Sequence, residues 1–149
     1  MSPRLAKKEQ AAKAVDTDQF QAALGDALAR AADDDRIRPL LRAAGLRMRF
    51  EFPDAGLVLN VATADDDDER LVWSFDRDVD WQPKLELTMD SGVANRFLQG
   101  RESLAIALAR GQARCRGESR TALLYLPATR LLCEPYRQAI RSGYPALAA

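Results

Sequence analysis

The chain has 149 residues, of which 47% are apolar, and its 22 basic residues balance its 22 acidic residues at a net charge of zero. This length suits one domain with a substantial core, and no apolar run reaches the roughly 18 residues that a membrane-spanning helix needs. Histidine is absent, which excludes Ser-His-Asp triads, Cys-His dyads and imidazole bases.

Two helices are predicted in the N-terminal part of the chain. Residues 1–15, rich in Ala, Lys and Gln, are expected to form a flexible arm. The acidic residues of segment 16–18 favour a helix start, because they supply an N-cap and complement the helix dipole. Apolar residues recur at helical spacing over 20–31, and a second short helix is indicated over 37–44, with Gly45 as its C-cap.

The hydrophobic pattern then alternates with a period of two, which is typical of half-buried strands. It predicts a hairpin over residues 46–62, whose turn at 53–56 contains the Pro and Gly that turns favour. A third strand is expected over 71–75 and a fourth over 84–89. The five consecutive acids at 65–69 are interpreted as a solvated loop tip, since they lack the ligand spacing of a calcium loop.

Helices and one more strand are predicted in the remaining stretch. A helix over 90–98 ends before Gly100, and a short helix follows over 103–110. The segment 112–116, bracketed by two glycines, reads as the fifth strand. Residues 121–140 form a last helical stretch that two prolines interrupt.

This order of elements predicts a single α+β domain. We expect a five-stranded, mostly antiparallel sheet with a crossover after the third strand and with helices packed on one face. The domain is expected to span residues 16–142, and residues 143–149 are expected to form a C-terminal tail.

Motifs for catalysis, phosphate binding or metal binding are not recognisable. Cys115 and Cys133 form no CxxC pair, and we expect both to be reduced residues of the core, with Ala113 and Cys115 facing inward in the last strand. No glycine-rich phosphate loop is present, and no pair of acids stands out for acid–base work. We therefore predict no catalytic residue, no metal ligand and no cofactor, with a carboxylate-based enzyme as an alternative.

The charges are distributed unevenly along the chain. Residues 1–90 carry 13 basic and 19 acidic side chains, whereas residues 91–149 carry 9 basic and 3 acidic ones. The C-terminal part could face an anionic partner such as a lipid headgroup, a membrane surface or a phosphate. Alternatively, the two halves neutralise each other within one fold. Nucleic acid is not expected as a partner, because the isoelectric point is about 6.3 and no basic stripe is interleaved with aromatic residues.

One segment has a more specific pattern. A strand of alternating apolar residues ends at Met89-Asp90, the following helix closes on Gly100, and a short helix leads to a strand between Gly111 and Gly117-Glu118. This pattern resembles the sterol carrier protein type two domain, whose element order also includes the crossover after three strands. Two departures are that Glu118 stands where the family usually has Asp and that no proline precedes the short helix.

The resemblance covers roughly residues 18–142 and implies a non-enzymatic, lipid-binding, single-domain protein of bacterial, cytoplasmic type. The last residues, 146–149, do not resemble a peroxisomal address. In that family an apolar tunnel lies between the sheet and the helices that cover it. The ligand-binding residues implied here are Trp73, Phe75, Leu87, Met89, Phe97, Leu98, Leu104, Leu108, Leu124, Leu131 and Leu132. For each of them, simple core packing is the alternative.

The function expected on this basis is binding or transfer of a sterol-like, fatty acyl or isoprenoid lipid. Arg114, Arg116 and Arg120 could meet an acidic headgroup. The alternative is an accessory factor for a lipid or isoprenoid-quinone pathway that acts through a protein partner, because domains resembling this one serve in ubiquinone biosynthesis. A transient membrane surface or partner enzyme is expected, and the protein is expected to be a monomer or a homodimer.

Overall fold

The computed structural model describes residues 15–64 and 70–148. In chain order its elements are α2 (Thr17–Asp33), α3 (Arg38–Ala44), β1 (Arg47–Phe52), η1 (Pro53–Ala55), β2 (Leu57–Thr63), β3 (Leu71–Ser74), β4 (Leu85–Met89), α4 (Ser91–Leu98), α5 (Leu104–Ala109), β5 (Ala113–Gly117), α6 (Ser119–Thr129), η2 (Arg130–Leu132), α7 (Cys133–Gly143) and η3 (Pro145–Ala148). Residues 1–14 of the expected arm and the acidic run 65–69 lie outside the described residues.

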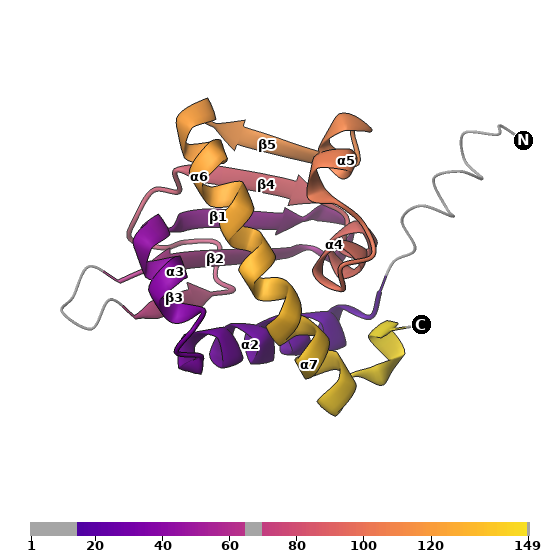
Figure 1. Cartoon of the computed structure of the whole chain (residues 1–149). Coiled ribbons are helices and arrows are strands. Elements are labelled where there is room, and N and C mark those ends of the chain that lie inside the picture. Colours follow the sequence, from indigo (N-terminus) through magenta and orange to yellow (C-terminus); the bar gives the residue numbers. More distant parts are fainter. Residues whose placement is uncertain (1–14, 65–69, 149) are drawn as a thin grey trace, which may run out of the picture.

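The five strands form one mixed sheet with the order β3-β2-β1-β4-β5 (Figure 1). Neighbouring strands are antiparallel except β1 and β4, which are parallel, with Met48 opposite Leu85 and Phe50 opposite Leu87. The parallel pair requires the chain to cross the sheet between β3 and β4, as a parallel connection must. The predicted α+β class, five strands and crossover are thereby confirmed.

Helices α2, α6 and α7 lie over one face of the sheet (Figure 1). Helix α2 begins where the sequence indicates, because Asp16 Oδ1 accepts a 2.9 Å hydrogen bond from Gln19 N. Its apolar stripe is buried against the sheet, and the Phe20 ring meets the Phe52 ring edge to face at 5.1 Å between centroids. The Tyr136 ring of α7 also meets Phe20 edge to face, at 6.5 Å between centroids. The core therefore fills the layer between sheet and helices.

The opposite face of the sheet is crossed by the connection between β3 and β4. Asn60 is fully buried there and donates from Nδ2 to the Asp76 carbonyl at 2.6 Å. Arg49 donates from Nε to Asn60 Oδ1 at 2.8 Å and from Nη2 to the Arg77 carbonyl at 3.0 Å. These bonds give the buried Asn60 amide and the Arg49 guanidinium partners on this face and tie the connection to the sheet.

The expected C-terminal tail contains the turn η3, whose Leu147 is 4% exposed. The Leu147 carbonyl accepts a 2.8 Å hydrogen bond from Asn95 Nδ2, and Asn95 Oδ1 accepts a 2.6 Å bond from the Tyr136 hydroxyl. This segment is thus packed against α4 and α7.

The expected burial of Cys115 is wrong. The register of β5 places Cys115 opposite Leu87, on the helix-facing side of the sheet as predicted, but its side chain is exposed. The reason is that β5 is the edge strand, where only Ala113 is buried. The last helical stretch is also longer than predicted: α6 begins at Ser119, and α7 ends at Gly143.

Candidate lipid-binding groove

A groove of about 680 Å³ lies between α5 and α6. We call it the α5–α6 groove. It is lined by Phe97, Gly100, Glu102, Ser103, Leu104, Ala105, Leu108, Ala122, Leu123, Leu126, Pro127, Arg130, Cys133 and Arg137. Most of these residues are apolar, and the volume is in the range of pockets that hold drug-sized ligands.

An N-cap and a glycine position the walls of the groove. Helix α5 starts at a side-chain cap, since Ser103 Oγ accepts a 3.4 Å hydrogen bond from Ile106 N. Helix α6 follows β5 directly after Gly117, where φ is +146° and a Cβ atom would stand 2.6 Å from the Lys84 carbonyl oxygen. Only glycine fits this close approach between β4 and β5, which sets where α6 can start.

The acid that lines the groove, Glu102, is paired with an arginine outside the lining. Glu102 is mostly buried, its side chain 13% exposed, and it forms a 2.8 Å ion pair with Arg96. The pair screens the carboxylate from any anionic group that enters the groove.

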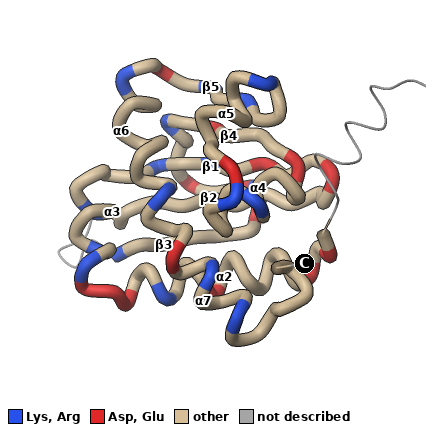
Figure 2. The backbone as a smooth tube through the Cα atoms, turned by 45° about the vertical axis from the view of Figure 1, so that its right-hand side comes forward, with Lys and Arg blue, Asp and Glu red and all other residues tan. Residues whose placement is uncertain are grey.

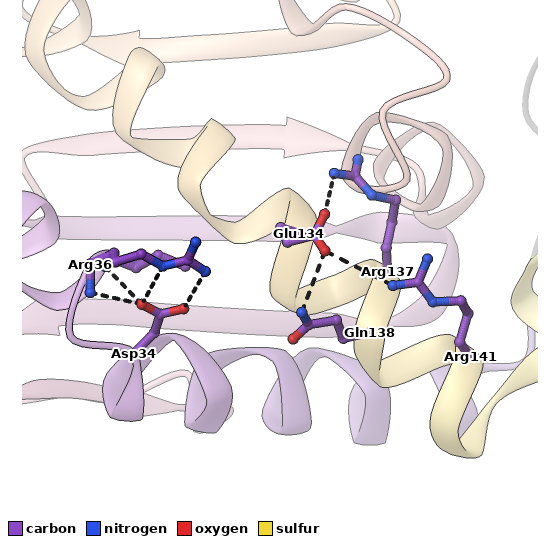
Figure 3. A network of polar contacts seen from close by, with 7 residues as sticks. Asp34, Arg36, Glu134, Arg137, Gln138 and Arg141 are labelled. Carbon is purple, nitrogen blue, oxygen red and sulfur yellow. Dashed lines mark hydrogen bonds and ion pairs between the residues drawn. The ribbon is translucent and has the colours of Figure 1, made fainter.

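Two arginines line the groove: Arg130, in the turn η2 between α6 and α7, and Arg137, on α7. They differ in their hydrogen bonds and ion pairs. Arg137 donates to Glu134 Oε2 at 2.7 Å and to the Gln99 carbonyl at 3.4 Å. Figure 3 shows Glu134 held in this way by its neighbours on α7. Arg130 is exposed, and its guanidinium makes no hydrogen bond or ion pair with another described residue. Among the described lining residues, Arg130 is therefore the cation free to meet an anionic ligand.

The groove offers little nucleophilic chemistry. Burial raises the pKa of the Cys133 thiol, although Arg137 and Arg130 oppose the shift, so the thiol stays protonated at neutral pH. No group of three or more potential metal-ligating side chains occurs in residues 15–64 and 70–148. In the same residues, no helix has the length and hydropathy to cross a bilayer. The described groove is thus mostly apolar, with Arg130 and Arg137 among its polar lining residues.

The layer between the sheet and the helices is closely packed. The cavity there, lined in part by Leu28, Phe50 and Tyr136, measures about 20 Å³. That is room for about one water molecule, because a buried water needs roughly 10–15 Å³ measured in this way.

The predicted ligand-binding residues are distributed over several places. Three of them, Phe97, Leu104 and Leu108, line the α5–α6 groove. Met89, Leu98 and Leu132 line the small core cavity, where Phe97 joins them. The structure therefore brings about half of the predicted set together in two neighbouring hollows that share Phe97.

The other five predicted residues line neither hollow. Trp73 lies in β3 and Phe75 follows it, and β3 is the edge strand at the other end of the strand order from β5. Leu87 is completely buried, Leu131 packs half-buried against the core, and Leu124 is 53% exposed on α6. Of the arginines considered for a headgroup, Arg114 and Arg116 point away from the helix-facing side, as the register of β5 requires.

The sequence patterns did not assign Leu123, Leu126 and Arg130 to the site. The signal that could have identified them is their spacing of three, four and seven residues, which places them on one side of a helix. The predicted set contains Leu124 in place of Leu123, since a helical stretch with interior prolines does not reveal which of two adjacent leucines faces the groove.

No family model matches the chain, and no curated protein matches it. Solved structures do match. The hypothetical protein TT1886 from Thermus thermophilus, described as possibly a sterol carrier protein, has a TM-score of 0.57 at 14% identity over 80% of this chain and 87% of its own. The ubiquinone synthesis protein UbiJ-SCP2 has a TM-score of 0.51 at 12% identity over 68% of this chain and 80% of its own.

A part of a larger protein is similar as well. The inverting sec-alkylsulfatase Pisa1 from Pseudomonas sp. gives a TM-score of 0.50 at 8% identity over 61% of this chain, which spans only 14% of the sulfatase. The two neighbours described before it are matched over most of their own length. The chain therefore has the sterol carrier protein type two fold, as its sequence predicted.

Proposed function

We propose that this protein binds a lipid with an apolar chain and an anionic headgroup in the α5–α6 groove, without catalysing a reaction on it, and that it is a diverged relative of the sterol carrier proteins. The observation that carries the proposal is the groove itself, because a volume of about 680 Å³ lined by leucines is available there. Burying apolar surface is worth about 25 cal/mol per Å², or about 0.8 kcal/mol for each methylene.

The chemistry of the groove favours a fatty acyl ligand among the lipids considered. Its apolar walls include Leu104, Leu108 and Leu126, and its polar end carries Arg130. A carboxylate at Arg130 makes a charge-assisted hydrogen bond, while the chain occupies the apolar walls. The neutralised Glu102 removes the repulsion that a free acid would exert.

Native mass spectrometry of the freshly purified protein, with lipid extraction of the same sample, tests this function. The proposal predicts a discrete added mass of lipid size, either as purified or after incubation with palmitate. An apo mass alone after incubation with palmitate and with an isoprenoid lipid contradicts it.

An accessory role through a protein partner is the second candidate. It is supported by the exposed leucines of α6 and by the likeness to UbiJ-SCP2, a ubiquinone synthesis protein. Affinity purification from the source cells distinguishes the two functions, since an accessory factor retains one stoichiometric partner and carries no lipid.

A further inference from the structure

The outer side of α6 has an unusual combination of side chains. Arg120, Leu123, Pro127 and Arg130 recur at spacings of three and four residues, so they share one side of the helix. Leu124 borders them. Leu123, with 79% of its surface exposed, is the most exposed large hydrophobic residue in the described part of the chain. We call these five residues the α6 outer face.

The charge of this face has one sign. Helix α6 contains no acidic residue, and Arg120 and Arg130 make no ion pair with another described residue. Of the three acids after residue 90, Glu102 and Glu134 are engaged by Arg96 and Arg137, which leaves Glu118 before the helix. In Figure 2, blue segments lie around β5 and the start of α6, and no red segment lies along α6 itself. The face is therefore complementary to a negatively charged surface.

Leucines between arginines match the requirements of a lipid–water interface. At such an interface leucine side chains enter the boundary between headgroups and acyl chains, while arginine stems lie along it and their guanidinium groups meet phosphates. Pro127 has no N–H to donate to the carbonyl of Leu123, four residues earlier, so the regular helical hydrogen bond is missing on this side of α6.

We infer that the α6 outer face docks this protein on anionic phospholipid membranes. Docking there requires no ligand in the α5–α6 groove, and it is measured independently of ligand binding. Leu123, Pro127 and Arg130 also line the groove, so a docked molecule holds the groove next to the lipid surface. If the proposed function holds, lipid passes between membrane and groove at this contact.

Co-sedimentation with vesicles tests the docking. The full chain is mixed with vesicles of phosphatidylcholine alone and with vesicles of phosphatidylcholine and phosphatidylglycerol in equal parts. We expect binding to the anionic vesicles, little binding to the neutral ones, and loss of binding as salt concentration rises. No binding to anionic vesicles, or equal binding to both kinds, overturns the inference.

Two substitutions with matched controls locate the contact. Leu123→Asp and Arg130→Glu should each weaken binding to anionic vesicles by at least about tenfold, since each adds negative charge at the contact. The controls are Leu40→Asp, at a leucine of α3 that is 56% exposed, and Arg77→Glu, on the other side of the sheet. Both controls should bind like the parent. Parent-like binding by Leu123→Asp, or equal weakening by the controls, places the contact elsewhere and contradicts the inference. All four sites are exposed, so circular dichroism should report the parental fold.

Discussion

The Tyr136 hydroxyl donates a 2.6 Å hydrogen bond to Asn95 Oδ1 in the protein interior, which joins α7 to α4. The same asparagine donates from Nδ2 to the Leu147 carbonyl at 2.8 Å, so a single side chain connects three segments. Tyr136 and Asn95 are both buried, and neither can exchange its partner for water. This link holds the C-terminal segment against α4 and α7. Arg137, one residue after Tyr136 on α7, lines the groove.

Replacing Tyr136 by Phe should therefore destabilise the fold. The substitution leaves Asn95 Oδ1 buried without its donor, and the free energy of unfolding should fall by about 1–3 kcal/mol. Urea denaturation followed by circular dichroism measures the change. Tyr144→Phe is the matched control, because the Tyr144 hydroxyl has no hydrogen bond to another described residue. Equal stability of the two variants would show that the buried link contributes nothing.

Tyr136 should also make stability depend on alkaline pH. Burial raises the pKa of its hydroxyl far above the ordinary value of 10.0. Below that value both states keep the proton. At higher pH the unfolded chain releases it while the folded protein retains it, so the free energy of unfolding falls as pH rises. Urea titrations between about pH 9 and 11 should give a shallower decline for Tyr136→Phe than for the parent. Parallel declines would contradict the burial of this hydroxyl.

Glu134 should titrate below an ordinary glutamate. Its hydrogen bond with Arg137, helped by Arg141 and Gln138, lowers the pKa of the carboxyl from the usual 4.5. The interaction stabilises the fold above the unfolded pKa and is lost as pH falls through the folded one. In Arg137→Gln the Glu134 pKa should move up, as NMR titration of the side-chain carboxyl can show. Arg30→Gln, which breaks the half-buried pair with Asp26 on α2, should leave the Glu134 pKa unchanged.

Substituting Gly117 should disturb the start of α6. In Gly117→Ala the new Cβ atom meets the Lys84 carbonyl oxygen at 2.6 Å, and φ of +146° is unfavourable for alanine. We expect a loss of about 1–3 kcal/mol in the free energy of unfolding. Gly143→Ala is the control, because nothing lies within 4 Å of its Cβ position. A melting temperature of Gly117→Ala equal to that of the control would mean that this close approach is absent in solution.

Several elements were predictable because local chemistry determines them. The Asp16 cap and the buried stripe from Phe20 fix α2, and strict alternation fixes β1 and β4. The capping of α4 was not predictable in the same way. Asp90 makes no side-chain cap bond, and Asp54 accepts instead from Ser91 N at 2.8 Å and from Ser91 Oγ at 2.6 Å. A contact between residues 37 positions apart leaves no local signal.

The position of the candidate site was only partly predictable. The resemblance implied an apolar tunnel between the sheet and the helices, but whether side chains leave space there depends on packing, which sequence patterns do not encode. Between sheet and helices the aromatic rings of Phe20, Phe50 and Phe52 fill the layer. The space lies beside them, where the short helix α5 stands off from α6.

The headgroup contact proposed at Arg130 can be separated experimentally from binding of the apolar chain. Arg130→Gln should weaken palmitate by about tenfold, because it removes one charge-assisted hydrogen bond, and should leave palmitic acid methyl ester unchanged. Competition with a fluorescent fatty acid measures both affinities. Arg77→Gln is the control for loss of a surface charge. Equal weakening of acid and ester would show that Arg130 acts on the shape of the groove and not on the headgroup.

The central claim is that the ligand occupies the α5–α6 groove, and fluorescent fatty acid binding to tryptophan variants tests it most directly. Leu108→Trp and Leu126→Trp each fill part of the groove and should lower affinity by at least about tenfold, the equivalent of roughly two methylene groups. Leu40→Trp adds the same side chain at an exposed position on α3 and should bind like the parent. Unchanged affinity in both groove variants, with the fold intact, would contradict the claim and place the ligand elsewhere.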